Sequence, residues 1–129
     1  MGKKEFQKIV RSSQGYILSD GTLKVDDLLL AFHQFAIRHN LRSAKKLVSQ
    51  VESLFEYTCN LQTNLREHFS FLHRLGKVRL KDDYESLESA SYLLNEDIFQ
   101  YMDDIAPKNY YFGSQEGDGA LIGFWKVEQ

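Results

Sequence analysis

Apolar residues recur every three or four positions along most of the chain, which is the spacing of amphipathic helices. The clearest case runs from Val25 to His39. Its apolar face consists of Val25, Leu28, Leu29, Phe32, Phe35 and Ala36. Asp26 and Asp27 fall in the first turn, where the helix dipole favours negative charge, and Asn40 is predicted to end the helix in a left-handed conformation.

Three later regions show the same spacing and predict further helices. They cover residues 43–58, residues 61–75 and a region from Asp82 to Ile105, which we expect to break at Asn95 before a last helix, Glu96–Ile105. Gly76 is predicted to end the second of these helices, and Pro107 ends the last. The predicted inward faces are Ala44, Leu47, Val48, Val51, Leu54 and Phe55; Leu61, Leu65, Phe69, Leu72 and Leu75; Tyr84, Leu87, Ser91 and Leu94; and Ile98, Phe99, Met102 and Ile105.

The C-terminal region loses the helical spacing and predicts a β-hairpin. One strand is Tyr110–Phe112, the other is 121–127, and residues 113–120 form a glycine-containing connection. Both faces of this pair are apolar as far as Trp125, so we expect both to be covered. The short β-prone run Tyr16–Leu18 could supply a third strand, because a lone hairpin is marginal in water.

These elements predict an α+β fold, with four or five helices packed on a small antiparallel sheet that is built on the C-terminal hairpin. A chain of 129 residues fits one domain, residues 1–129. Residues 1–15 are polar and basic. They are predicted to be loosely attached, either frayed or with Phe6, Ile9 and Val10 as one helical turn against the body.

The amino-acid composition indicates the cellular environment of the protein. Hydrophobic residues make up 43% and charged residues 26%, which is typical of a globular chain. The single cysteine, Cys59, allows no internal disulfide and suits a reducing compartment. The first residues lack the apolar run of a signal peptide, and no apolar block is long enough to span a bilayer. We therefore expect a cytoplasmic protein with no membrane partner.

Charge is divided unequally along the chain. Residues 1–81 carry a net charge of +7 and residues 82–129 a net charge of −9. Either the two halves pack together and neutralise each other, or a basic face binds an acidic partner such as nucleic acid. The basic residues are densest from 38 to 46. The candidate nucleic-acid contacts are Arg38, Arg42, Lys45 and Lys46, and the alternative is a solvated loop and helix start.

Motifs for catalysis or metal binding are missing from the sequence. The four histidines have no zinc-site spacing, Cys59 has no activating base beside it in the sequence, and no phosphate-binding or nucleophile motif occurs. His33 is placed near the core edge, and the other three histidines are expected on the surface. Glu116 and Asp118 form only a weak start for a calcium site and fit a solvated turn better. No catalytic residue, metal site or cofactor is predicted, and an enzyme is the weakest functional option.

The C-terminal aromatic residues are the best candidates for recognition. Tyr110, Tyr111 and Trp125 are predicted contacts for a protein partner, because such rings are typical of interface hot spots. The alternative is that these rings close the core of a small domain. Phe112 and Phe124 are expected inside. Tyr110 and Trp125 lie near the strand ends and are the better candidates for an exposed platform.

Two stretches resemble a group of small uncharacterised proteins of phages, plasmids and integrated mobile elements. They are the run from Asp20 to Phe32 (DGTLKVDDLLLAF) and the ending from Leu94 to Trp125, which includes YYFGSQEGDGALIGFW. The group commonly has proline at position 25 and a small residue followed by histidine around 114–115, where this chain has Val25, Ser114 and Gln115. The resemblance implies that the two ends form one module, and it implies no activity or catalytic residue. The leading expectation is a non-enzymatic interaction protein that modulates a host or element protein, and the alternative is a nucleic-acid-binding accessory protein.

Overall fold

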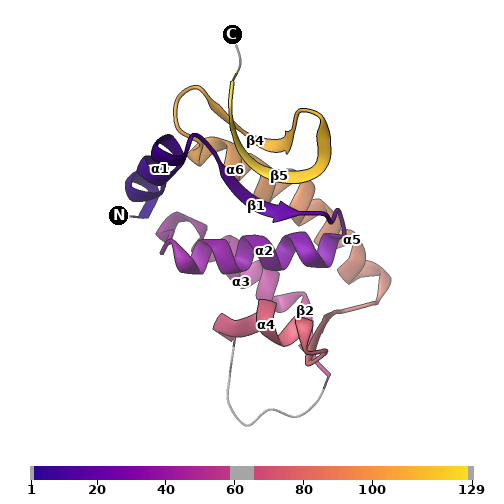
Figure 1. Ribbon diagram of the computed structural model, residues 1–129. Coiled ribbons are helices and arrows are strands. Elements are labelled where there is room, and N and C mark those ends of the chain that lie inside the picture. Colours follow the sequence, from indigo (N-terminus) through magenta and orange to yellow (C-terminus); the bar gives the residue numbers. More distant parts are fainter. Residues whose placement is uncertain (1, 59–65, 128–129) are drawn as a thin grey trace.

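The computed structural model describes residues 2–58 and 66–127 and confirms the α+β class (Figure 1). Its elements in chain order are α1 (Gly2–Ser13), β1 (Tyr16–Asp20), α2 (Val25–Arg38), the short 3-10 turn η1 (Arg42–Ala44), α3 (Lys45–Ser53), β2 (Phe55–Tyr57), a second 3-10 turn η2 (Arg66–His68), α4 (Phe69–Arg74), β3 (Val78–Leu80), α5 (Tyr84–Tyr92), the π-helical turn η3 (Leu93–Ile98), α6 (Phe99–Ile105), β4 (Tyr110–Gln115) and β5 (Asp118–Lys126). In Figure 1, α2 runs beneath β1, α6 lies behind the sheet, and α4 and β2 lie at the far end of the molecule from the hairpin.

The N-terminal segment is an integral part of the fold, so the prediction of a loose attachment is wrong. Phe6 and Val10 on α1 are fully buried. The Phe6 ring packs edge-on against Phe35 and Phe124, with ring centroids 4.9 Å apart in both pairs. Burial of an aromatic ring removes a large apolar area from water, which offsets the entropy cost of ordering a short terminal helix.

The three-stranded sheet joins the two ends of the chain. β5 lies in the centre, antiparallel to β1 on one side and to β4 on the other, with Phe124 opposite both Tyr16 and Phe112. The predicted third strand is therefore confirmed. The predicted connection 113–120 is wrong: the strands extend to Gln115 and Asp118, and the turn is the pair Glu116–Gly117. Gly117 has a φ of 90°, which glycine adopts at little cost.

The hairpin has one buried face and one that is partly open. Phe112, Ile122 and Phe124 are buried against the helices, whereas Ile17 on β1, opposite Gly123, is 55% exposed. The helices cover the first face, as expected. On the second face Tyr111 and Trp125 are half-buried, so cover by a partner on that face stays a prediction.

The predicted helix over residues 43–58 is wrong at its C-terminal end. α3 ends at Ser53, and Phe55–Tyr57 becomes strand β2, antiparallel to β3 in a separate two-stranded sheet. Residues 78–80, which look like a plain connector in sequence, supply the pairing partner. Phe55 is buried in the strand. A buried position is also what the predicted helix required of it, so its spacing did not distinguish a helix from a strand.

The next predicted helix, 61–75, is seen only in part. Residues 59–65, which include Cys59, Leu61 and Leu65, lie outside the described residues. Phe69 and Leu72 on α4 are buried as predicted, but Leu75 is 54% exposed and does not join the core. Gly76, with a φ of 75°, ends this helix as predicted.

The region from Asp83 to Ile105 forms α5, η3 and α6 without a break at Asn95, and the break or bend expected there takes the form of the π turn η3. Asp83, rather than Asp82, is the N-cap, and its side chain accepts a hydrogen bond from the Ser86 N–H. Tyr84 and Leu87, predicted to face inward, are 78% and 45% exposed. The helix ends as predicted, because Ala106 takes an extended conformation before Pro107.

The π-helical turn follows from the spacing of buried side chains. Ala90, Leu94, Ile98 and Met102 are all buried and lie four positions apart. In an α-helix a four-residue step overshoots one turn by about 40°, so this line would drift around the helix. The wider π turn absorbs the drift. Its hydrogen bond from the Phe99 N–H to the Leu94 carbonyl spans five residues.

Within residues 2–58 and 66–127, no helix is long and apolar enough to cross a membrane.

Candidate functional site

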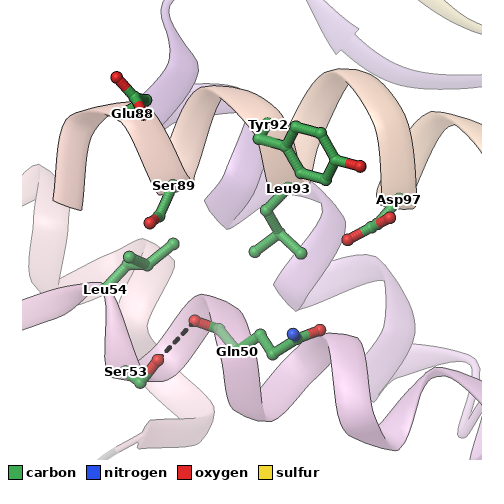
Figure 2. A pocket seen from close by; sticks show the side chains of 8 residues that line it. All are labelled: Gln50, Ser53, Leu54, Glu88, Ser89, Tyr92, Leu93 and Asp97. Carbon is green, nitrogen blue, oxygen red and sulfur yellow. Dashed lines mark hydrogen bonds between the residues drawn. The ribbon is translucent and has the colours of Figure 1, made fainter. Parts of the chain in front are cut away.

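A groove between α3 and the α5–η3 segment is the first candidate site (Figure 2). It encloses about 580 Å³. α3 and the residue after it contribute Gln50, Ser53 and Leu54. The opposite wall consists of Glu88, Ser89, Tyr92, Leu93 and Asp97. The wall residues are mainly polar and include two carboxylates, so the groove suits a polar or cationic ligand.

The same groove continues towards α6. Gln50 and Asp97 also line a second hollow of about 330 Å³, together with Lys46, Leu47, Gln100, Tyr101 and Asp104. Tyr101 anchors this end, because its hydroxyl lies 2.8 Å from Ser43 Oγ. Burial raises the pKa of Tyr101, and the hydrogen bond with Ser43 opposes that rise. We call the two hollows together the α3–α5 groove.

The π turn is what brings Asp97 to this groove. In an α-helix, residues five positions apart point about 140° away from each other. Because η3 closes its turn over five residues, Asp97 instead comes back to the side of Tyr92. Figure 2 shows both side chains on the wall that faces Gln50. π turns inserted into α-helices are frequent at functional sites.

The partly open face of the sheet is the second candidate site. Tyr111 on β4 and Trp125 on β5 lie directly opposite each other. They line a shallow hollow of about 640 Å³ with Gln14, Gln115, Glu116, Lys126 and Val127. Next along the pair, Gly113 lies opposite Gly123, so these two positions carry no side chain, and Ile17 of β1 continues the row. We call this surface the Tyr111–Trp125 face.

Both rings on this face are held in place by hydrogen bonds. Trp125 Nε1 donates to the Gly113 carbonyl at 2.9 Å, and the Tyr111 hydroxyl donates to the Ser114 carbonyl at 3.1 Å. Tyr110, Tyr111 and Trp125 are all half-buried, but of the three only Tyr110 packs against the hydrophobic core. The alternation of side chains along a strand therefore separates Tyr110 from the two other predicted contacts.

The four predicted nucleic-acid contacts, Arg38, Arg42, Lys45 and Lys46, are all exposed around the junction of α2 and α3. Lys46 opens onto the hollow that also contains Asp97 and Asp104, so the basic and acidic halves of the chain meet at this point. Arg38 lies apart, in a small hollow beside β1. The structure thus does not gather these four cations in a single recessed site.

Two histidine clusters lie at or near α2. His33 is fully buried, its Nε2 lies 2.8 Å from Glu52 Oε2, and its ring stacks on Phe69. His73 is 3.1 Å from Asp26 and, with Asp27, forms a group whose ligand atoms lie within 4.8 Å of one another. Thr22 donates to Asp27 in the same cluster. Helix capping and ion pairing account for this arrangement without a metal.

No protein-family model, curated protein or solved structure matches the chain. The functional argument therefore rests on the two surfaces. Sequence reasoning identified the rings of the Tyr111–Trp125 face but missed the α3–α5 groove. The sequence signal for the π turn was the four-residue spacing of Ala90, Leu94, Ile98 and Met102. In an uninterrupted α-helix each such step rotates the side chain by about 40° around the helix.

Proposed function

We propose that this protein is a non-enzymatic interaction protein that binds a protein partner through the Tyr111–Trp125 face. The observation that carries the proposal is the pairing of these two rings on a partly open sheet face. Large aromatic side chains provide much contact area and lose little conformational entropy on binding, which is why they dominate interface energetics.

The hydrogen bonds to Gly113 and Ser114 favour this function. These bonds fix the orientation of each ring in the free protein, so binding of a partner would cost little side-chain conformational entropy.

The biological setting is part of the same proposal. The resemblance of residues 20–32 and 94–125 to proteins of phages, plasmids and mobile elements supports a role in modulating a host or element protein. A cytoplasmic location fits a chain with one cysteine and no disulfide.

Affinity capture from cells that naturally contain the protein tests the proposal. Wild type, Tyr111→Ala and Trp125→Ala are compared with Phe71→Ala, a matched aromatic control that is 53% exposed on α4. We expect a protein that is captured by wild type and the control and lost from both sheet variants, while all four retain the same circular dichroism spectrum. Equal capture by all variants would refute the role of this face, and unfolding of the sheet variants would assign the rings to structural packing.

Nucleic-acid binding is the second candidate, favoured by the common exposure of Arg38, Arg42, Lys45 and Lys46. A titration with DNA and RNA oligonucleotides at several salt concentrations tests it. An affinity that falls steeply with salt and is weakened by Arg42→Gln would support it. A flat response across all oligonucleotides would remove it.

A further inference from the structure

The wall of the α3–α5 groove that α5, η3 and α6 form carries exposed carboxylates. Glu88 and Asp97 line the first hollow, and Asp97 and Asp104 line the second. Among the described lining residues of both hollows, Lys46 is the one cation, and it lies at the α6 end. The first hollow therefore has a negative potential that no lining residue offsets.

Aromatic side chains accompany these carboxylates. Tyr84, Glu88 and Tyr92 follow one another at four-residue spacing on α5 and share one side of the helix. Tyr84 is 78% and Tyr92 64% exposed. An aromatic face beside a carboxylate favours a cation, because the ring quadrupole and the negative charge attract it together.

The shape of the groove favours a chain rather than a small ion. Two hollows joined at Gln50 and Asp97 extend along α3, past one turn of helix. Leu54 and Leu93, which line the first hollow, and Leu47, which lines the second, add apolar surface. A lone cation would use one carboxylate, whereas a segment that alternates basic and apolar residues can use the carboxylates, the rings and the leucines at once.

We infer that the α3–α5 groove binds a basic segment of a protein partner, with an arginine side chain in the first hollow. The guanidinium pairs with the carboxylate of Asp97 and lies against the Tyr92 ring, and a second basic residue of the segment pairs with Glu88, about 13 Å away along the helix. The π turn is essential to this arrangement, because it returns Asp97 to the side of Tyr92. The site uses elements other than β4 and β5, so it stands independently of the Tyr111–Trp125 face.

A peptide titration tests the inference. The probe is a fluorescein-labelled nine-residue peptide that repeats alanine, leucine and arginine three times, and its control replaces each arginine with the neutral isostere citrulline. Fluorescence anisotropy at physiological salt gives the affinity, and amide chemical shifts of the isotope-labelled protein locate the site. We expect binding of the arginine peptide, with shifts confined to residues 46–54 and 88–104, and loss of binding for the citrulline peptide.

A charge-neutral variant separates specific contacts from general attraction. Glu88→Gln with Asp97→Asn keeps the side-chain shapes and removes both carboxylates. The matched control, Glu5→Gln with Glu67→Gln, removes the same charge from exposed positions outside the groove. We expect about a tenfold weaker affinity for the groove variant, as two partly exposed ion pairs would provide, and little change for the control.

Four outcomes would overturn the inference. They are equal binding of the citrulline peptide, equal weakening by both double variants, chemical shifts outside the groove, and self-association of the wild-type chain that the groove variant abolishes. The last outcome would make a second copy of the chain, through its basic residues, the occupant instead.

Discussion

The Tyr16 hydroxyl lies 3.0 Å from Nε2 of His39 and ties the first strand to the end of α2. Both rings also pack on Phe6, so the contact lies where the N-terminal helix, the sheet and α2 meet. In the neutral tautomer with its proton on Nδ1, His39 Nε2 accepts a hydrogen bond from the Tyr16 hydroxyl. Burial lowers the pKa of His39, and the nearby Arg38 guanidinium lowers it further.

This contact predicts a pH dependence of stability. Because the folded-state pKa lies below the ordinary value of 6.5, the stabilisation is complete above pH 6.5 and is lost as the pH falls towards the folded-state pKa. Urea unfolding between pH 7.5 and 5 should show a decreasing free energy of unfolding. His39→Gln should flatten this dependence, whereas His68→Gln, at an exposed position, should leave it intact. Equal slopes for wild type and His39→Gln would contradict the assignment.

The burial of Phe6 predicts that α1 contributes to global stability. Phe6→Ala should lower the free energy of unfolding by about 3–5 kcal/mol, because it leaves a cavity among Tyr16, Phe35 and Phe124. Ile9→Ala on the same helix, at a position 42% exposed, should cost about 1 kcal/mol or less. Denaturant unfolding measures both. Similar small losses would return α1 to the loosely attached segment expected from the sequence.

The close approach of β1 to β5 predicts that Gly123 tolerates no side chain. A Cβ at Gly123 would overlap the Tyr16 carbonyl oxygen and lie 3.1 Å from the Ile17 Cα, both backbone atoms that cannot move independently. Gly123→Ala should therefore cost about 1–3 kcal/mol or more. Gly119→Ala is the control, since a Cβ there meets nothing within 4 Å. Thermal unfolding of the two variants should differ clearly, and identical midpoints would count against this strand register.

The cap of α5 predicts a difference between two adjacent aspartates. Asp83 accepts from the Ser86 N–H at 2.9 Å and from the Ser86 hydroxyl at 2.8 Å, and these bonds, the backbone one first, lower the pKa of Asp83. Asp83→Ala should destabilise the protein more than Asp82→Ala does. The advantage of Asp83 should be present above pH 3.8 and be lost as the pH falls through its lowered folded-state pKa. Unfolding curves at pH 6 and pH 3 test both statements, and a larger loss for Asp82→Ala would place the cap one residue earlier.

The elements predicted from sequence share one property, which is that their signal is local. α2 has an uninterrupted apolar face with acidic residues in its first turn, and it forms from Val25 to Arg38. Asn40 and Gly76 end helices with positive φ angles, as these two residue types predict. Helical periodicity and helix-terminating residues act over a few positions, so both can be recognised in the sequence without knowledge of the tertiary structure.

The incorrect predictions share the opposite property. Phe55–Tyr57 becomes a strand because Val78–Leu80, more than 20 positions away, offers it backbone partners. Tyr84 and Leu87 match a helical face but lie outward, because the side that α5 buries is set by Ala90 and Leu94 and by the π turn beyond them.

The sequence by itself determined the fold class, the strongest helix, the helix ends and the set of aromatic residues in the hairpin, because periodicity and backbone preference are properties of short stretches. The tertiary structure alone decided which way those rings face. Strand pairing sends Tyr110 towards the core and places Tyr111 opposite Trp125 on the partly open side. The tertiary structure also decided that Asp97 lies beside Tyr92 in a groove. The reason is that the π turn depends on packing that keeps Leu94, Ile98 and Met102 buried together.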